Sequence, residues 1–233
     1  MITIYKILIY NPLFNILVFF YQTIAFKDLG IAIIYLTILI RLILYPLSQK
    51  TLETQFNLQK IQPKIKEIQN KHKKDPQTQL KEIMDLYKQN NINIFSMYLF
   101  LIIQIPFLIA LFQIFSRNFD VNLINVYSFI SAPQTINPYF LGFINLEKPN
   151  IILVFLASFF QFLQTFIGFL VLKTPKNPST FLAYFATIFT FIILIYLPSA
   201  VSLYILITNI ISFIQQLFIN KKFKKENELA RIY

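Results

Sequence analysis

Long apolar runs separated by short polar segments dominate this chain. A helix needs about 20 residues at 1.5 Å each to cross the hydrocarbon of a bilayer. Five runs come close to that length: Leu29–Leu47, Ile94–Phe115, Ile151–Leu172, Thr180–Leu197 and Ser199–Ile219. Pro198 divides the last two, which predicts two helices joined by almost no loop. The pattern therefore predicts an all-α polytopic membrane protein with a core of five transmembrane helices.

A further apolar stretch, Ile7–Phe26, precedes these runs but is broken by polar residues and a proline. Its largest apolar residues recur at helical spacing: Leu13, Ile16, Leu17 and Phe20. An amphipathic helix of this kind suits the membrane interface. We expect it to lie in the interface on the outer side, with a sixth span as the alternative.

The polar segment between the first two runs predicts a pair of amphipathic helices. One apolar seam steps by three and four residues: Thr54, Leu58, Ile61, Ile65 and Ile68. Asp75 and Pro76 are typical of a helix start, as cap and first residue. A second stripe follows: Leu80, Ile83, Met84 and Tyr87. The two stripes favour an antiparallel helical hairpin over a solvated loop.

Charge sets the expected orientation. The chain has a formal net charge of +11, and sixteen of its 21 Lys and Arg residues fall in the hairpin, in the loop after the third run and in the tail. The positive-inside rule places these segments in the cytoplasm and the N-terminus outside, which agrees with five spans. The expected division is an outer interfacial helix (1–28), first span (29–47), cytoplasmic hairpin (48–93), second span (94–115), outer loop (116–150), three further spans (151–219) and basic cytoplasmic tail (220–233).

The residues needed for most chemistry are missing. The chain has no cysteine, and none of its ten acidic residues lies in a predicted span. Its one histidine, His72, belongs to the lysine-rich turn of the hairpin, where a solvated surface residue is expected. Zinc-protease spacing, a nucleophile elbow and a phosphate-binding glycine loop are also absent. We therefore expect no enzyme activity, metal or cofactor.

Arg41 is the exception, since it lies well inside the first apolar run. An arginine at the centre of a bilayer costs roughly 2.5–3.5 kcal/mol on insertion scales. Its side chain could snorkel to the cytoplasmic headgroups, but we favour a hydrated groove inside the bundle. The candidates to line that groove with it are Thr37, Gln104, Gln161, Gln164, Ser202 and Asn209, with Gln113 and Ser158 as further polar residues.

A groove with a fixed positive charge and no proton relay suits a transient polar or acidic guest. The guest's charged part would sit against Arg41 while its apolar part leaves sideways into lipid. Two alternatives stay open. One is a small-solute transporter or channel, which needs a pathway continuous to the outside. The other is an assembly subunit, in which Arg41 pairs with an acidic residue of another protein.

The residues resemble the YidC/Oxa/Alb family of membrane protein insertases. Four stretches carry the resemblance in the family's order: "AIIYLTILIRLILYPLSQK", "LQKIQPKIKEIQNKHKKDPQTQLKEIMDLYKQNNIN", "LFLIIQIPFLIALFQIF" and "YLPSAVSLYILITNIISFIQQLFINKK". They cover about half of the chain. The family's large extracytoplasmic domain, its extra N-terminal span and a lipoprotein cysteine have no counterpart here, which favours a minimal bacterial form.

The resemblance implies a groove open to the cytoplasm and to lipid but closed outside, in the bacterial inner membrane. Arg41 would be the groove arginine, and Gln104 with Pro106 would form the family's Q-x-P. The expected partners are nascent membrane proteins, membrane lipid, the Sec translocon, the signal recognition particle receptor and the ribosome, with no sequence-specific nucleic acid binding. The lysines expected at the ribosome or partner surface are Lys71, Lys73, Lys74, Lys221, Lys222, Lys224 and Lys225.

Overall fold

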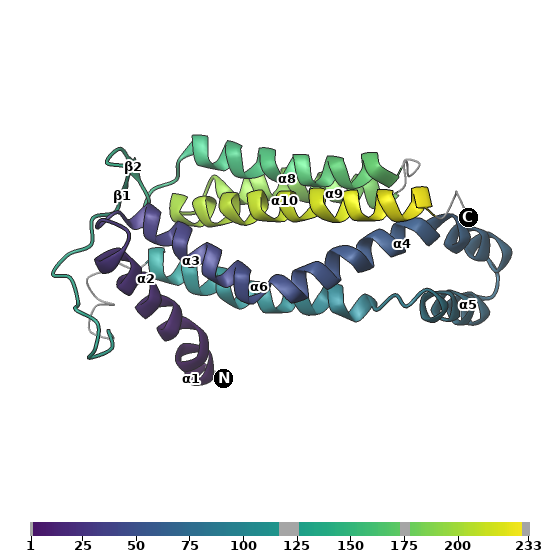
Figure 1. The fold of residues 1–233 in the computed structure, drawn as a ribbon, viewed down its shortest axis with the longest axis horizontal. Helices are drawn as coiled ribbons and strands as arrows, with labels where there is room; N and C mark the ends of the chain where they lie inside the picture. Colours follow the sequence, from purple (N-terminus) through teal and green to yellow (C-terminus); the bar gives the residue numbers. More distant parts are fainter. Residues whose placement is uncertain (1, 117–125, 173–177, 230–233) are drawn as a thin grey trace.

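The computed structural model describes residues 2–116, 126–172 and 178–229 (Figure 1). The elements run in the order α1 (Ile2–Tyr5), the π-helix η1 (Lys6–Tyr10), α2 (Asn11–Thr23), α3 (Leu29–Ile43), α4 (Tyr45–Lys71), α5 (Pro76–Gln89), α6 (Ile94–Ser116), β1 (Tyr139–Phe140), β2 (Ile144–Asn145), α8 (Ile151–Leu172), α9 (Pro178–Leu194) and α10 (Ser199–Leu229). These residues are mostly helical, which confirms the predicted all-α class.

The long helices form two groups that lie side by side. Figure 1 shows α8, α9 and α10 together along one side and α3, α4 and α6 along the other. Helix α10 joins the groups, because it packs against both α8 and α3. Among the described residues, Ser199–Lys221 is long and apolar enough to cross a membrane by itself, and α3 with α4 qualifies only as a bent pair. The five-span arrangement stays a prediction.

The apolar run Leu29–Leu47 is broken rather than continuous. Helix α3 ends at Ile43, and α4 begins at Tyr45 after a bend of 66°. Pro46, one residue into α4, explains the break. Proline has no N–H, and its ring clashes with the carbonyl four residues back, here that of Leu42, which disfavours the continuation of α3 through this point. The run that was predicted as one helix is therefore divided between two helices, and its position as the first span stays a prediction.

Helices α4 and α5 form a hairpin around a small apolar cluster. Ile61, Ile65 and Ile92 are buried, with Leu58, Ile83, Leu86 and Tyr87 packed against them. As predicted, Asp75 caps α5, and its Oδ1 accepts a hydrogen bond from the Thr78 N–H at 3.2 Å. Only part of the predicted second stripe packs into this cluster, because Leu80 and Met84 are 63% and 50% exposed.

Helix α2 packs along α3 with the face Leu13, Phe14, Leu17, Val18 and Tyr21 buried. The interfacial position of α2 stays a prediction. In the loop that follows α6, β1 and β2 form a short antiparallel ladder. Three residues connect the strands, with positive φ at Leu141 and Gly142 and a hydrogen bond from the Phe143 N–H to the Phe140 carbonyl at 3.2 Å.

The β1–β2 hairpin connects the starts of α3 and α10 through hydrogen bonds. Asp28 caps α3 through Oδ1, while its Oδ2 accepts from the Leu141 N–H at 2.6 Å. On the other side, the Ser199 hydroxyl donates to the carbonyl of Asn145 at 2.8 Å, and the Ala200 N–H donates to the carbonyl of Leu146 at 3.0 Å. Main-chain and side-chain hydrogen bonds therefore link the two helix starts at this end of the bundle.

Candidate functional site: the Arg41 cavity

The bend at Leu44 creates a cavity between α3–α4 and α10. Figure 1 shows α3 and α4 as a shallow V whose vertex points away from α10. The space inside it is a cavity of about 440 Å³, which we call the Arg41 cavity. Its lining comes from both arms of the V and from α10: Ile38, Arg41, Leu42, Tyr45, Gln49, Ile211, Ile214, Gln215, Phe218 and Ile219. Pro46 therefore shapes the site through the backbone.

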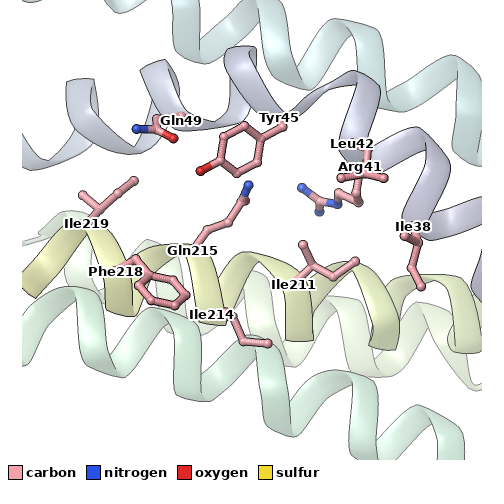
Figure 2. A pocket seen from close by; sticks show the side chains of 10 residues that line it. All are labelled: Ile38, Arg41, Leu42, Tyr45, Gln49, Ile211, Ile214, Gln215, Phe218 and Ile219. Carbon is pink, nitrogen blue, oxygen red and sulfur yellow. The ribbon is translucent and has the colours of Figure 1, made fainter.

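The polar groups of this cavity face one another across the gap. Figure 2 shows Arg41 and Tyr45 projecting from the α3–α4 side and Gln215 reaching toward them from α10. Arg41 is only 6% exposed although it lines the cavity. On the rim, Leu42 and Phe218 are 64% and 69% exposed. The guanidinium thus lies deep in a recess whose mouth is apolar and open.

Tyr204 connects Arg41 to a second predicted residue. Its side chain is 2% exposed and lies near the Arg41 guanidinium. Gln104 of α6 donates a hydrogen bond from Nε2 to the Tyr204 hydroxyl. Residues from α3, α6 and α10 are therefore brought together by Tyr204, which the sequence did not single out.

Ser48 and Gln215 hold the two sides of the cavity together. The Ser48 hydroxyl lies 3.4 Å from Oε1 and 3.3 Å from Nε2 of Gln215. Both side chains are buried, at 4% and 9% exposure. This bond ties the start of α4 to α10 and fixes the width of the cavity at that point.

None of the five remaining candidates lines the Arg41 cavity, and three of them form hydrogen bonds within or between helices. The Thr37 hydroxyl donates to the Ile33 carbonyl at 2.7 Å. Asn209 donates from Nδ2 to the Ala157 carbonyl at 3.0 Å, and Gln161 donates from Nε2 to Thr190 Oγ1 at 3.2 Å. The other two predicted residues are buried or half-buried on their helices: Ser202 and Gln164.

The predicted lysine surface divides between two places. Lys73 and Lys74 are exposed in the hairpin turn, and Lys71 lies 3.6 Å from Glu82 Oε1. The same carboxylate oxygen is 3.0 Å from His72 Nε2, so His72 has a partner on α5. Lys221 is exposed on α10. The side chains of three further lysines lie outside the described part: Lys222, Lys224 and Lys225.

Tyr45, Gln49, Tyr204 and Gln215 are the polar lining or neighbouring residues that sequence reasoning missed. Tyr45 and Gln49 follow Arg41 at intervals of four, so helical spacing alone could have placed them on its face. Tyr204 and Gln215 had no such signal, because nothing in the sequence shows how α10 is rotated about its axis relative to α3. Among the residues described, no group of three potential metal ligands occurs.

Comparison with known proteins identifies the family. The family model described as the 60Kd inner membrane protein matches residues 5–226. The membrane protein insertases YidC of Campylobacter jejuni and Wolinella succinogenes are 31% and 32% identical over 93% and 94% of this chain. Membrane protein insertase YidC 1 of Listeria monocytogenes is 35% identical over 85% of this chain and 66% of its own length.

The chain spans 38% of the length of the Campylobacter and Wolinella relatives. The similarity nevertheless runs through α2, the bent pair α3–α4, the α4–α5 hairpin and α10 as far as residue 226. The elements that build the Arg41 cavity are thus elements that the family model covers. With 5–226 of its 233 residues matched, the chain belongs to the family of the 60Kd inner membrane protein.

Proposed function

We propose that this chain inserts proteins into the membrane by receiving their short polar segments in the Arg41 cavity. The observation that carries the proposal is a guanidinium 6% exposed at the back of a 440 Å³ recess. A volume of this size admits on the order of ten waters. A polar guest segment would then exchange bulk water for a hydrated, positively charged recess, and not for hydrocarbon. The insertase names of the relatives support this function.

The gain for the guest is electrostatic. An aspartate at the centre of a bilayer costs about 2.5–3.5 kcal/mol on insertion scales. A carboxylate about 4 Å from a guanidinium gains ~1 kcal/mol in water and ~4 kcal/mol at an effective dielectric constant of 20. Water and one fixed charge are therefore enough to offset most of the penalty. Neither a nucleotide nor a bond-breaking step is needed.

Lateral release is the second half of the proposal. The rim residues Leu42, Phe218 and Ile214 are 64%, 69% and 45% exposed. In a membrane, such a rim faces acyl chains, so an apolar segment of the client can leave between α3 and α10 without crossing a polar barrier. The apolar mouth beside a charged recess separates the two parts of the client by their polarity.

We place the cavity on the cytoplasmic side of the bundle. The lysine-rich α4–α5 hairpin and the end of α10 would lie in the cytoplasm, with the N-terminus outside, five spans and α2 in the outer interface. At the opposite end, several residues are 0% exposed: Leu29, Ala32, Ile33, Leu146, Ser199 and Ala200. This packed end supports an insertase rather than a channel, because a channel needs a path through it.

The partners follow from this placement. Nascent membrane proteins are the clients, either directly or beside the Sec translocon. Exposed Lys73, Lys74 and Lys221 suit anionic surfaces such as ribosomal RNA, the signal recognition particle receptor or lipid headgroups. Each lysine close to an anionic membrane contributes about 1 kcal/mol. The inner membrane of a bacterium is the proposed location.

Reconstitution tests the function. Purified protein in nucleotide-free liposomes should raise the insertion of a short single-span client above that in empty vesicles. The matched control is Gln134→Met, on the exposed part of the outer loop, which should insert as the unaltered protein does. Insertion equal to that in empty vesicles would contradict the proposal.

A further inference from the structure

A second, smaller hollow lies next to the Arg41 cavity on the same α4–α10 seam. Its volume is about 20 Å³, and it shares Ile219 with the larger cavity. The residues that line it are Leu52, Gln55, Phe56, Gln59, Gln216, Ile219 and Asn220. We call it the amide hollow, because four of these side chains end in a carboxamide.

Three of the carboxamides have hydrogen-bonding atoms with no partner among the described residues. These buried atoms are Oε1 of Gln59, Oε1 of Gln216 and Nδ2 of Asn220. A buried donor or acceptor left unsatisfied costs about 1–3 kcal/mol. A carboxamide offers both a donor and an acceptor, so exchanging its O and N changes which atom is unsatisfied but not the need for a partner. Three such groups in one hollow point to a ligand.

The size and chemistry of the hollow define that ligand. One water requires at least about 10–15 Å³ and makes two to four hydrogen bonds. A single water could donate to Gln59 Oε1 and Gln216 Oε1 and accept from Asn220 Nδ2. Among the described residues that line the hollow, none is charged, which disfavours an ion. We propose that the amide hollow is the site of one structural water that bridges α4 to α10.

The proposed water completes a row of attachments along the seam. Nearest the Arg41 cavity is the Ser48–Gln215 hydrogen bond, and next is the apolar pair Phe56 and Ile219, both under 8% exposed. Gln59 lies three residues beyond Phe56 on α4, and Asn220 lies one residue beyond Ile219 on α10. The water would therefore hold the part of α4 from which the hairpin projects. This inference concerns the resting position of the hairpin and does not depend on the proposed function.

Nuclear magnetic resonance can detect the water directly. In ¹⁵N-labelled protein in lipid nanodiscs, comparing laboratory- and rotating-frame cross-relaxation distinguishes a long-lived water from bulk water. We expect long-lived transfer to the Asn220 side-chain amide. Asn209 is the matched control, since its buried amide is bonded directly to the Ala157 carbonyl, and it should show none. Transfer to Asn220 no stronger than to Asn209 would overturn the proposal.

A distance measurement tests what the water does. Because the chain lacks cysteine, spin labels can be placed at Lys73→Cys in the hairpin turn and Phe155→Cys on α8 without background. Gln216→Met keeps the side-chain length but removes a partner of the water, so the distance distribution should broaden; Gln134→Met should leave it unchanged. An unchanged distribution in Gln216→Met would show that no bridge positions the hairpin. Insertion into liposomes is a separate readout, so this result does not affect the proposed function.

Discussion

The charge of Arg41 should matter in proportion to the acidity of the client. A carboxylate about 4 Å from the guanidinium gains ~1 kcal/mol in bulk water and ~4 kcal/mol at an effective dielectric constant of 20. Arg41 is 6% exposed but lines a wide recess, so an intermediate value of about 2 kcal/mol is expected for the first acidic residue. That energy corresponds to a factor of roughly 30.

The assay compares single-span clients that differ only in having no, one or two aspartates in the translocated tail. In liposomes, Arg41→Gln should slow the one-aspartate client by roughly 30-fold relative to the neutral client if the full 2 kcal/mol is expressed in the barrier. Arg41→Lys keeps a positive charge and should retain most of the difference between the clients. Equal slowing of the neutral and acidic clients in Arg41→Gln would refute the electrostatic role.

Three further predictions concern the scaffold. In Gly30→Ala, the new Cβ would lie 2.7 Å from the Phe140 Cβ, so thermal unfolding should show a loss of about 1–3 kcal/mol from overpacking; unchanged stability would contradict this contact. Asp28→Ala removes a helix cap and should cost about 1 kcal/mol, whereas Asp28→Asn should lose less; equal losses would argue against capping. Hydrogen bonds from the Thr78 side chain and then its backbone lower the pKa of Asp75 below 3.8. The cap should therefore be fully present above that pH and be lost as the pH falls through the lowered pKa. The loss should appear as lower hydrogen-exchange protection factors, which correct for the intrinsic pH dependence of exchange, at the start of α5; protection factors that do not change with pH would contradict it.

The apolar runs predicted the limits of some long helices closely, but α9 ends three residues before its run, at Leu194, and α10 continues ten residues beyond Ile219. The run Ile94–Phe115 corresponds to α6, which ends one residue later, and α8 and α10 begin where the runs begin. This agreement arises because a continuous run of about twenty apolar residues strongly favours a helix. Their place in a bilayer is not fixed by these limits and stays a prediction.

The bend at Leu44 was missed because the apolar run continues through it. Pro46 was the available signal, but hydropathy outweighed it in reading Leu29–Leu47 as one helix. The β1–β2 hairpin was missed for a different reason. Its strands have two residues each, which is too short for an alternating pattern, and hydrogen bonds to α3 and α10 stabilise it.

The candidate site was predicted through Arg41, and its neighbours were predicted less well. An arginine inside an apolar run is conspicuous in any sequence. Polar residues on the other runs are not, since each can bond across a helix contact, as Asn209 and Gln161 do. Which of them face Arg41 depends on the rotation of each helix about its axis. That rotation is set by packing and is not encoded locally.

The central claim is that Arg41 lies in a recess reached from the cytoplasm and closed from the outside. Single cysteines introduced along the Arg41 cavity test it most directly, because the chain has no cysteine of its own. In sealed vesicles, Tyr45→Cys and Gln49→Cys should react with a membrane-impermeant thiol reagent added on the cytoplasmic side only, whereas Ile33→Cys should not react from either side. Reaction of the cavity cysteines from the outer side, or of none of them from either side, would contradict the account.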